Sequence, residues 1–177
     1  KLEERFSDYT ALQSIDALLN WDASVMMPEK AMSQRARQGA VLSVKMHGLL
    51  TDKETGQWIL QAQDEKLEGW QAANLRVMQR LHAHATALTP EMVAKRKQQE
   101  AKTEMTWRQA RAANDFAMLK PEFEALLAIV REAAAMKSDK LGVSPYDALL
   151  DSYAPGMRSA EVDAIFDDLA AFLPGVL

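Results

Sequence analysis

The chain contains no cysteine, and this absence excludes disulfides and thiol chemistry. Long hydrophobic runs are also missing: none approaches the roughly 20 apolar residues that a membrane-spanning helix needs. The seven glycines are scattered, so no glycine-rich loop is available to cradle a phosphate. Charged residues throughout positions 1–20 do not fit a signal peptide. We therefore expect a cytoplasmic protein that makes no membrane contact.

Excess positive charge is lacking as well, because the formal net charge is −4. Residues 90–111 carry a local balance of +3 and residues 144–177 a balance of −5, which is typical of solvated helix faces. A nucleic-acid surface normally shows a strong basic excess. We expect no nucleic-acid partner, and the role of the basic helix predicted over residues 90–119 stays open.

Apolar residues recur at intervals of three or four along the chain, which is typical of amphipathic α-helices. The first such stripe consists of Leu2, Phe6, Tyr9, Leu12, Ile15 and Leu19. No segment alternates at period two, so no strand is predicted. The pattern predicts an all-α fold, an antiparallel array of seven or eight helices that forms a single helical region over residues 1–177.

Proline and capping residues predict where these helices begin. Proline suits the first turn of a helix, and Ser or Thr can accept a hydrogen bond from a free backbone N–H there. The expected start signals are Pro28, Thr51 in a capping box with Glu54, Thr89 before Pro90, Pro121, Ser144 before Pro145, and Ser159. A small-residue stripe that includes Gly39 and Ala40 should let another helix approach the second one closely.

Catalytic motifs are absent from the sequence. His82 and His84 are two positions apart on a predicted helix, so they point about 200° apart and cannot bind one metal ion from that helix. His47 has no carboxylate at a helical spacing that would make a metal pair. The chain contains no His-Glu-x-x-His helix and no Gly-x-Ser-x-Gly elbow. We expect no catalytic and no metal-binding residue in this chain.

Two segments carry a family resemblance. The first is NWDASVMMPEKAMSQRAR, residues 20–37, which joins two predicted helices through aromatic and apolar residues instead of a short polar turn. The second is PYDALLDSYAPGM, residues 145–157. Both resemble blocks in the N-terminal region of the carboxypeptidase Taq family, in the same order, and the resemblance spans essentially the whole chain. The family-motif positions are Trp21, Asp22, Met27, Pro28, Tyr146, Asp147, Asp151, Pro155 and Gly156.

The resemblance implies the N-terminal part of a larger all-helical metallopeptidase. Members of that family remove residues from peptide C-termini and tend to be homodimers. They hold zinc or another divalent metal with a His-Glu-x-x-His helix and a further glutamate, in a portion that this sequence does not include. The apolar ending LPGVL agrees with a chain that continues. This chain would then supply scaffold and part of the cleft wall.

The motif residues should have structural or cleft-wall roles. We expect Trp21, Met26 and Met27 in a core, packed against helices contributed later in the chain. Asp22 should cap a helix or pair with an arginine, and Tyr146 with Asp147 should do the same in the second block. The alternative is a non-enzymatic helical module, in which the basic helix and the acidic tail bind a protein partner.

Overall fold

The computed structural model describes residues 1–176, except for the side chain of Glu29. Within this part of the chain the fold is all-α, as predicted, with eight α-helices and no strand. The helices are α1 (Leu2–Val25), α2 (Met32–Thr51), α3 (Lys53–Gln63), α4 (Gly69–Thr86), α5 (Pro90–Ala113), α6 (Phe116–Leu141), α7 (Pro145–Leu150) and α8 (Ser159–Phe172). Short 3₁₀ turns occupy Glu29–Ala31 and Leu173–Gly175. None of these helices combines the length and the apolar character that crossing a membrane requires.

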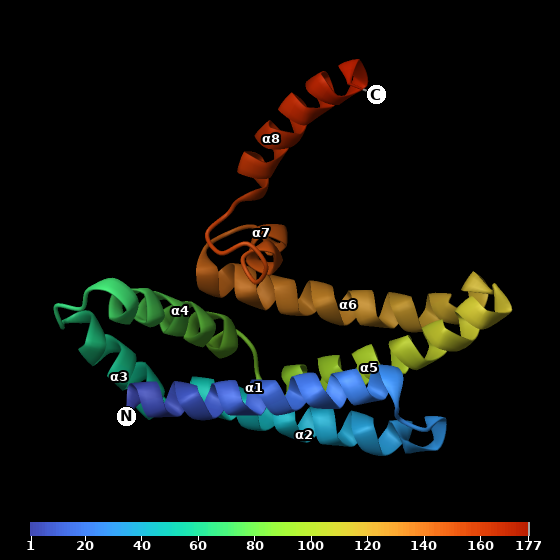
Figure 1. Cartoon of the computed structure of the whole chain (residues 1–177), viewed down its shortest axis with the longest axis horizontal. Helices are drawn as coiled ribbons and strands as arrows, with labels where there is room; N and C mark the ends of the chain where they lie inside the picture. Colours follow the sequence, from blue (N-terminus) through green and yellow to red (C-terminus); the bar gives the residue numbers. More distant parts are fainter. Residues whose placement is uncertain (177) are drawn as a thin grey trace.

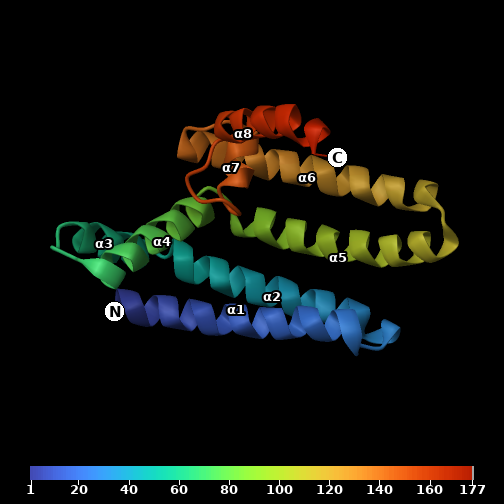
Figure 2. The same ribbon diagram turned by 45° about the horizontal axis from the view of Figure 1, so that its top comes forward.

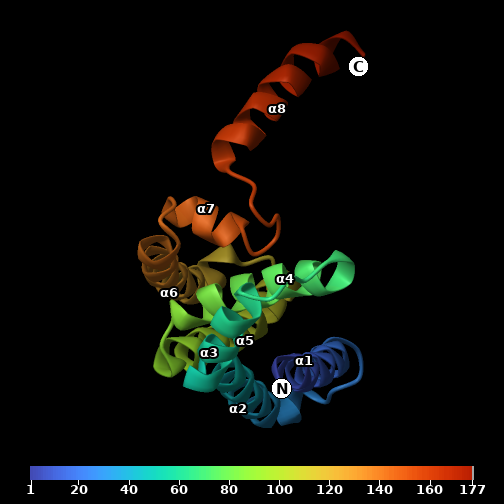
Figure 3. The ribbon, with the colours of Figure 1, turned by 90° about the vertical axis from the view of Figure 1, so that its left-hand side faces the viewer.

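Two helical hairpins form the body of the molecule (Figures 1 and 2). Helices α1 and α2 make one hairpin, α5 and α6 make the other, and α2 packs along α5. Helices α3 and α4 join the two hairpins at one end, and α7 packs on the C-terminal part of α6. Helix α8 stands away from this body and contacts α7 and the 3₁₀ turn that follows it (Figure 3).

The small-residue stripe on α2 explains its close contact with α5. Gly39 and Ala40 are buried, and a Cβ atom placed on Gly39 would lie 3.2 Å from Cε of Lys97 on α5. This distance is shorter than an ordinary van der Waals contact. The expectation that small residues allow another helix to approach α2 is confirmed.

Buried apolar residues form two separate clusters. Phe6, Leu50 and Ala85 join α1, α2 and α4, while Met92, Ile129 and Ala133 join α5 and α6. The predicted stripe on α1 is therefore buried mainly near its N-terminal end. Ile15, further along the same stripe, is exposed.

Several helix starts follow the sequence prediction. The Thr89 side chain accepts a hydrogen bond from the Met92 N–H, with Pro90 as the first helical residue. The Ser144 side chain accepts one from the Asp147 N–H, again before a proline. Local caps of this kind depend on residues three positions apart, so the sequence alone reveals them.

The predicted capping box at Thr51 is wrong. The residue that caps α3 is Asp52, whose side chain accepts a hydrogen bond from the Glu54 N–H at 2.8 Å. Thr51 is the last residue of α2, and its hydroxyl donates to the His47 carbonyl four residues earlier. The stronger acceptor directly after Thr51 places the boundary one residue later.

The predicted boundary between the fifth and sixth helices is also wrong. Helix α5 ends at Ala113 instead of residue 119, because Asn114 adopts the left-handed conformation with φ 51°. Asp115 then caps α6, and Pro121 lies inside that helix, in its second turn. Asparagine tolerates the left-handed region and aspartate is a good cap, so this pair outweighs the proline signal.

Two further starts are shifted. Pro28 precedes the 3₁₀ turn, and the α-helix itself begins at Met32. Ser159 is the first residue of α8, not its cap. The N-cap residue is Arg158, whose N–H donates to the Glu161 carboxylate.

Candidate functional site

The first motif block fastens the end of the α1–α2 hairpin. Nη2 of Arg35 lies 2.5 Å from Oδ2 of Asp22, and Nη1 of Arg35 donates to the Leu19 carbonyl at 2.8 Å. The expectation that Asp22 pairs with an arginine is confirmed. The Asp22 carbonyl also accepts hydrogen bonds from the Met26 and Met27 N–H groups, which ends α1.

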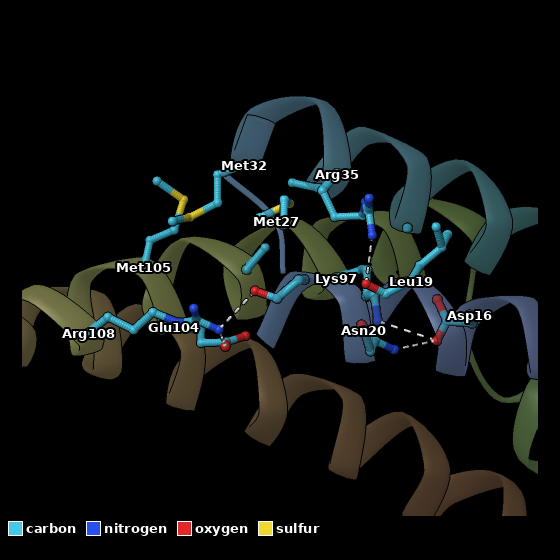
Figure 4. Close-up of a pocket in the computed structure, with 14 residues that line it drawn as sticks. Asp16, Leu19, Asn20, Met27, Met32, Arg35, Lys97, Glu104, Met105 and Arg108 are labelled. Atoms are coloured by element: carbon cyan, nitrogen blue, oxygen red, sulfur yellow. Dashed lines mark hydrogen bonds and ion pairs between the residues drawn. The ribbon is translucent and has the colours of Figure 1, made fainter. Parts of the chain in front are cut away.

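Next to this pair, α1, α2 and α5 enclose a cavity of about 80 Å³ (Figure 4). Met27, Met32 and Met105 line its apolar side. Its polar side consists of Asp16, Asn20, Lys97, Glu104 and Arg108, together with Arg35. Ligand pockets usually measure about 300 Å³ or more, so this cavity is too small to hold a peptide by itself.

The charged side chains of this cavity already pair with one another. Asp16 accepts a hydrogen bond from Asn20 at 2.9 Å, and its Oδ2 lies 3.7 Å from Nζ of Lys97. Arg108 pairs with Glu104 at 2.7 Å and reaches the Ala23 carbonyl on α1 at 3.4 Å. These contacts connect the C-terminal half of α1 to α5. We therefore interpret the cavity as part of the packing between these helices.

The aromatic and sulfur side chains of the first block are mostly exposed. Trp21 is 59% exposed and Met26 is 68% exposed, so residues 1–176 build no core around them. Met27 is half-buried against the cavity, and Pro28 is exposed. Helix α5 packs against this end of the hairpin but leaves Trp21 and Met26 exposed, so their packing against parts contributed later in the chain stays a prediction.

In the second block, Asp147 holds the start of α8. Its Oδ1 accepts a hydrogen bond from the Ser159 N–H at 2.7 Å, although the two residues are 12 positions apart. Hydrogen bonds from the Ser159 backbone and side chain, with a further one from Ser144, hold the pKa of the Asp147 carboxyl below its ordinary value. Asp147 therefore acts as a cap, as expected, whereas Tyr146 beside it is 68% exposed.

Asp151 is the first residue of the loop between α7 and α8, and its side chain organises that loop. Its Oδ1 accepts the Gly156 N–H at 2.9 Å, and its Oδ2 lies 2.7 Å from Nε2 of His84 on α4. Gly156 has φ 83°, a conformation that favours glycine in the turn after Pro155. Burial raises the pKa of Asp151, but hydrogen bonds from His84 and Gly156 outweigh it, so the pKa lies below its ordinary value.

The three histidines have separate partners. His82 Nδ1 lies 2.7 Å from the Leu50 carbonyl, His84 pairs with Asp151, and His47 hydrogen-bonds the Leu88 backbone. Burial lowers the pKa of His47. The contact between His84 and Asp151 could not be predicted from local sequence patterns, because it joins residues 67 positions apart. Among residues 1–176, no three His, Asp or Glu side chains gather closely enough to hold a metal ion.

The two motif blocks do not form one site. The first lies at the far end of the α1–α2 hairpin and the second lies on the C-terminal part of α6, well apart along the molecule (Figures 1 and 2). Each block stabilises a connection between helices. The arrangement supplies structure, including the contact of the Asp147 carboxylate with Ser159 at the start of α8.

Comparison with known proteins gives one consistent result. A family model described as carboxypeptidase Taq (M32) metallopeptidase matches residues 1–177. Thermostable carboxypeptidase 1 of Thermus thermophilus is 32% identical, over 94% of this chain and 35% of its own length. Thermostable carboxypeptidase 1 of Pyrococcus furiosus is 29% identical, over 94% of this chain and 33% of its own length. The chain thus spans about a third of the curated relatives that it matches.

Solved structures with a similar fold are also carboxypeptidases. Metallocarboxypeptidase 1 of Trypanosoma cruzi superposes with a TM-score of 0.81 at 32% identity, covering 98% of this chain and 35% of that one. An M32 carboxypeptidase from Deinococcus radiodurans superposes with a TM-score of 0.75 at 30% identity, again over 98% and 35% of the two chains.

Proposed function

The chain belongs to the carboxypeptidase Taq (M32) metallopeptidase family, and from this membership we propose that the whole protein is a metal-dependent carboxypeptidase. It would hydrolyse the last peptide bond of peptides and release single C-terminal residues. The observation that carries this proposal is the family match over residues 1–177. The same match favours the enzyme over the alternative of a non-enzymatic interaction module.

Within that enzyme, we propose that residues 1–177 are an N-terminal helical region that supplies scaffold and part of the cleft wall. Two features support this role. The described residues contain no group that could hold a metal ion. Exposed apolar side chains at the hairpin end and along α8, including Trp21, Met26, Phe166 and Phe172, offer surfaces on which further helices can pack.

The metal belongs to another part of the proposed enzyme. Membership in a metallopeptidase family implies a divalent metal in the full-length protein, and zinc is our proposal for its identity. Residues 1–176 do not fit such an ion, so no catalytic step is assigned to them. A peptide substrate, a homodimer and a cytoplasmic location are likewise proposals for the whole protein.

Hydrolysis of an N-blocked dipeptide by the complete protein tests the activity. We expect release of the C-terminal amino acid, its loss after treatment with a chelator, and its return with zinc, cobalt or manganese. The matched substrate with an amidated C-terminus should be cleaved much more slowly. Release that persists after chelation, or equal cleavage of the amide, would contradict the proposal.

The 177-residue chain by itself should be inert in the same assay, because its described residues supply no metal site. Metal-dependent release of an amino acid by this chain would place the active site within it.

A further inference from the structure

A second cavity, of about 260 Å³, is lined by residues of α4, of the end of α6 and of the loop between α7 and α8. It is separate from the cavity between α1, α2 and α5. Two guanidinium groups and one carboxylate line it, those of Arg80, Arg158 and Asp151. Its remaining wall includes the apolar side chains of Ala83, Leu141 and Val143. We call it the Arg80–Arg158 cavity.

The carboxylate of Asp151 does not satisfy these two arginines. Its oxygens accept their hydrogen bonds from His84 and Gly156, while the nearest nitrogens of Arg80 and Arg158 lie 3.8 and 3.7 Å from them. These distances are too long for hydrogen bonds, which lie near 2.7–3.2 Å. The charges still attract one another, but neither guanidinium group forms a bidentate hydrogen-bonded pair with the Asp151 carboxylate.

Most donors of the two arginines have no acceptor in the described part of the chain. Nη1 of Arg80 donates to the Asp151 carbonyl at 2.7 Å, and Nη1 of Arg158 donates to the Met157 carbonyl at 3.0 Å. No hydrogen bond from Nε or Nη2 of either residue to another described residue is formed. Because arginine carries five N–H donors in a planar fork, several are left to bind an acceptor in the cavity.

A buried lysine increases the local excess of positive charge. Lys137 is 7% exposed and lies one helical turn before Leu141, which lines the cavity. Among residues 1–176, no carboxylate oxygen lies within 4.0 Å of its ammonium nitrogen. Burial lowers the pKa of Lys137, and the charge of Arg96 lowers it further, while Asp151 opposes both. Three cations, Arg80, Arg158 and Lys137, thus lie near two carboxylates, those of Asp151 and Asp147, which leaves an excess of positive charge at this partly exposed site.

We propose that the Arg80–Arg158 cavity binds the carboxylate group of a small monocarboxylate with a short apolar substituent. The two guanidinium forks match the planar carboxylate. Asp151 disfavours a doubly charged oxyanion such as phosphate through like-charge repulsion. The apolar wall of Ala83, Leu141 and Val143 accommodates a short alkyl group.

Titration of the complete protein with propionate, followed by saturation-transfer NMR at constant ionic strength, tests the proposal. We expect saturable binding that Arg158→Gln weakens at least tenfold and Arg158→Lys weakens less, since lysine keeps the charge but not the fork. Arg131→Gln is the matched control, because Arg131 is exposed on α6 and does not line the cavity. It should leave binding unchanged.

The results of this titration distinguish binding in the Arg80–Arg158 cavity from binding elsewhere on the protein. Absence of saturable binding overturns the proposal, and so does binding that Arg158→Gln leaves intact, which would place the carboxylate in a peptide-binding site elsewhere. Tighter binding of inorganic phosphate than of propionate overturns the assignment to monocarboxylates. The experiment uses no peptide substrate, so its failure leaves the proposed peptidase activity untouched.

Discussion

Oδ2 of Asp151 lies 2.7 Å from Nε2 of His84, and this contact joins the loop before α8 to α4 across 67 positions of the sequence. The same carboxylate accepts the Gly156 N–H, so one side chain fixes the turn of the loop and attaches the loop to the body of the molecule. Both contacts favour the ionised carboxylate, which explains why the pKa of Asp151 lies below its ordinary value despite burial.

Asp151→Asn should lower the free energy of unfolding by about 1–3 kcal/mol at pH 7, because it disturbs a buried hydrogen-bonded carboxylate. The folded-state pKa lies below the unfolded value, so the stabilisation is present above the unfolded pKa and is lost as the pH falls through the folded pKa. Urea unfolding should therefore show a difference between wild type and variant that narrows below about pH 4.

Asp163→Asn is the control for this change, because Asp163 is exposed on α8 and makes no ion pair in the described part of the chain. Its unfolding curve should match that of the wild type within experimental error at pH 7 and at pH 3. A difference for Asp151→Asn that stays constant from pH 7 down to pH 3 would mean that the charge of Asp151 contributes nothing.

Thr89→Ala should lower the thermal midpoint. The hydroxyl of Thr89 accepts the Met92 N–H at the start of α5, and losing such a cap costs about 1 kcal/mol. For a chain of this size that corresponds to a shift of about 2–4 °C, measurable by circular dichroism.

Lys95→Ala on the same helix is the matched control, since Lys95 and its partner Glu132 are both about half exposed. Lys97 is unsuitable, although its place in a basic helix suggests a free surface charge. It contacts Gly39 and faces Asp16 in the small cavity. Equal effects of Thr89→Ala and Lys95→Ala would show that the cap contributes no more than a surface ion pair.

Gly48→Ala should stabilise the chain by about 0.5–1 kcal/mol, because alanine loses less backbone freedom on entering a helix. No atom lies within 4 Å of the added methyl group at this position of α2. Gly39→Ala should stabilise the chain less than Gly48→Ala or should destabilise it, since its methyl group would lie 3.2 Å from Cε of Lys97. Denaturant midpoints of the two variants give the comparison, and a larger gain at Gly39 would contradict the tight packing of α2 on α5.

The sequence predicts the parts of the fold that depend on near neighbours. The caps at Thr89 and Ser144 lie within three residues of their partners and are confirmed. Where two adjacent residues can both cap, as at Thr51 and Asp52, the spacing alone does not decide between them. The left-handed turn at Asn114 ends α5 before Pro121 by the same kind of local competition.

Contacts between distant segments are beyond such rules. The sequence identified Asp147 and Asp151 through their motif, but their partners Ser159 and His84 depend on how α7 packs against α6 and α8 and on how α6 packs against α4. Hydrophobicity predicts that Trp21 prefers a core, yet it does not say which part of a protein supplies that core.

The last prediction concerns association of the 177-residue chain. One face of α8 and the turn after it is apolar, and six of its large side chains are between 41% and 64% exposed: Ile165, Phe166, Leu169, Phe172, Leu173 and Val176. No residue of α8 is buried. Exposed apolar patches of this kind tend to be covered by association, most often in a two-fold dimer.

We therefore expect this chain to dimerise through α8 at micromolar concentration, as measured by sedimentation equilibrium. Trp21 and Met26 lie at the C-terminal end of α1, a helix that does not pack against α8, so they do not share this face. Phe166→Glu should give monomers, because a buried unpaired carboxylate at the centre of an apolar contact is costly. Ala164→Glu, on the opposite face of the same helix, should leave the dimer intact. A wild-type monomer, or a dimer that survives Phe166→Glu but is lost in Trp21→Glu, would move the interface away from α8.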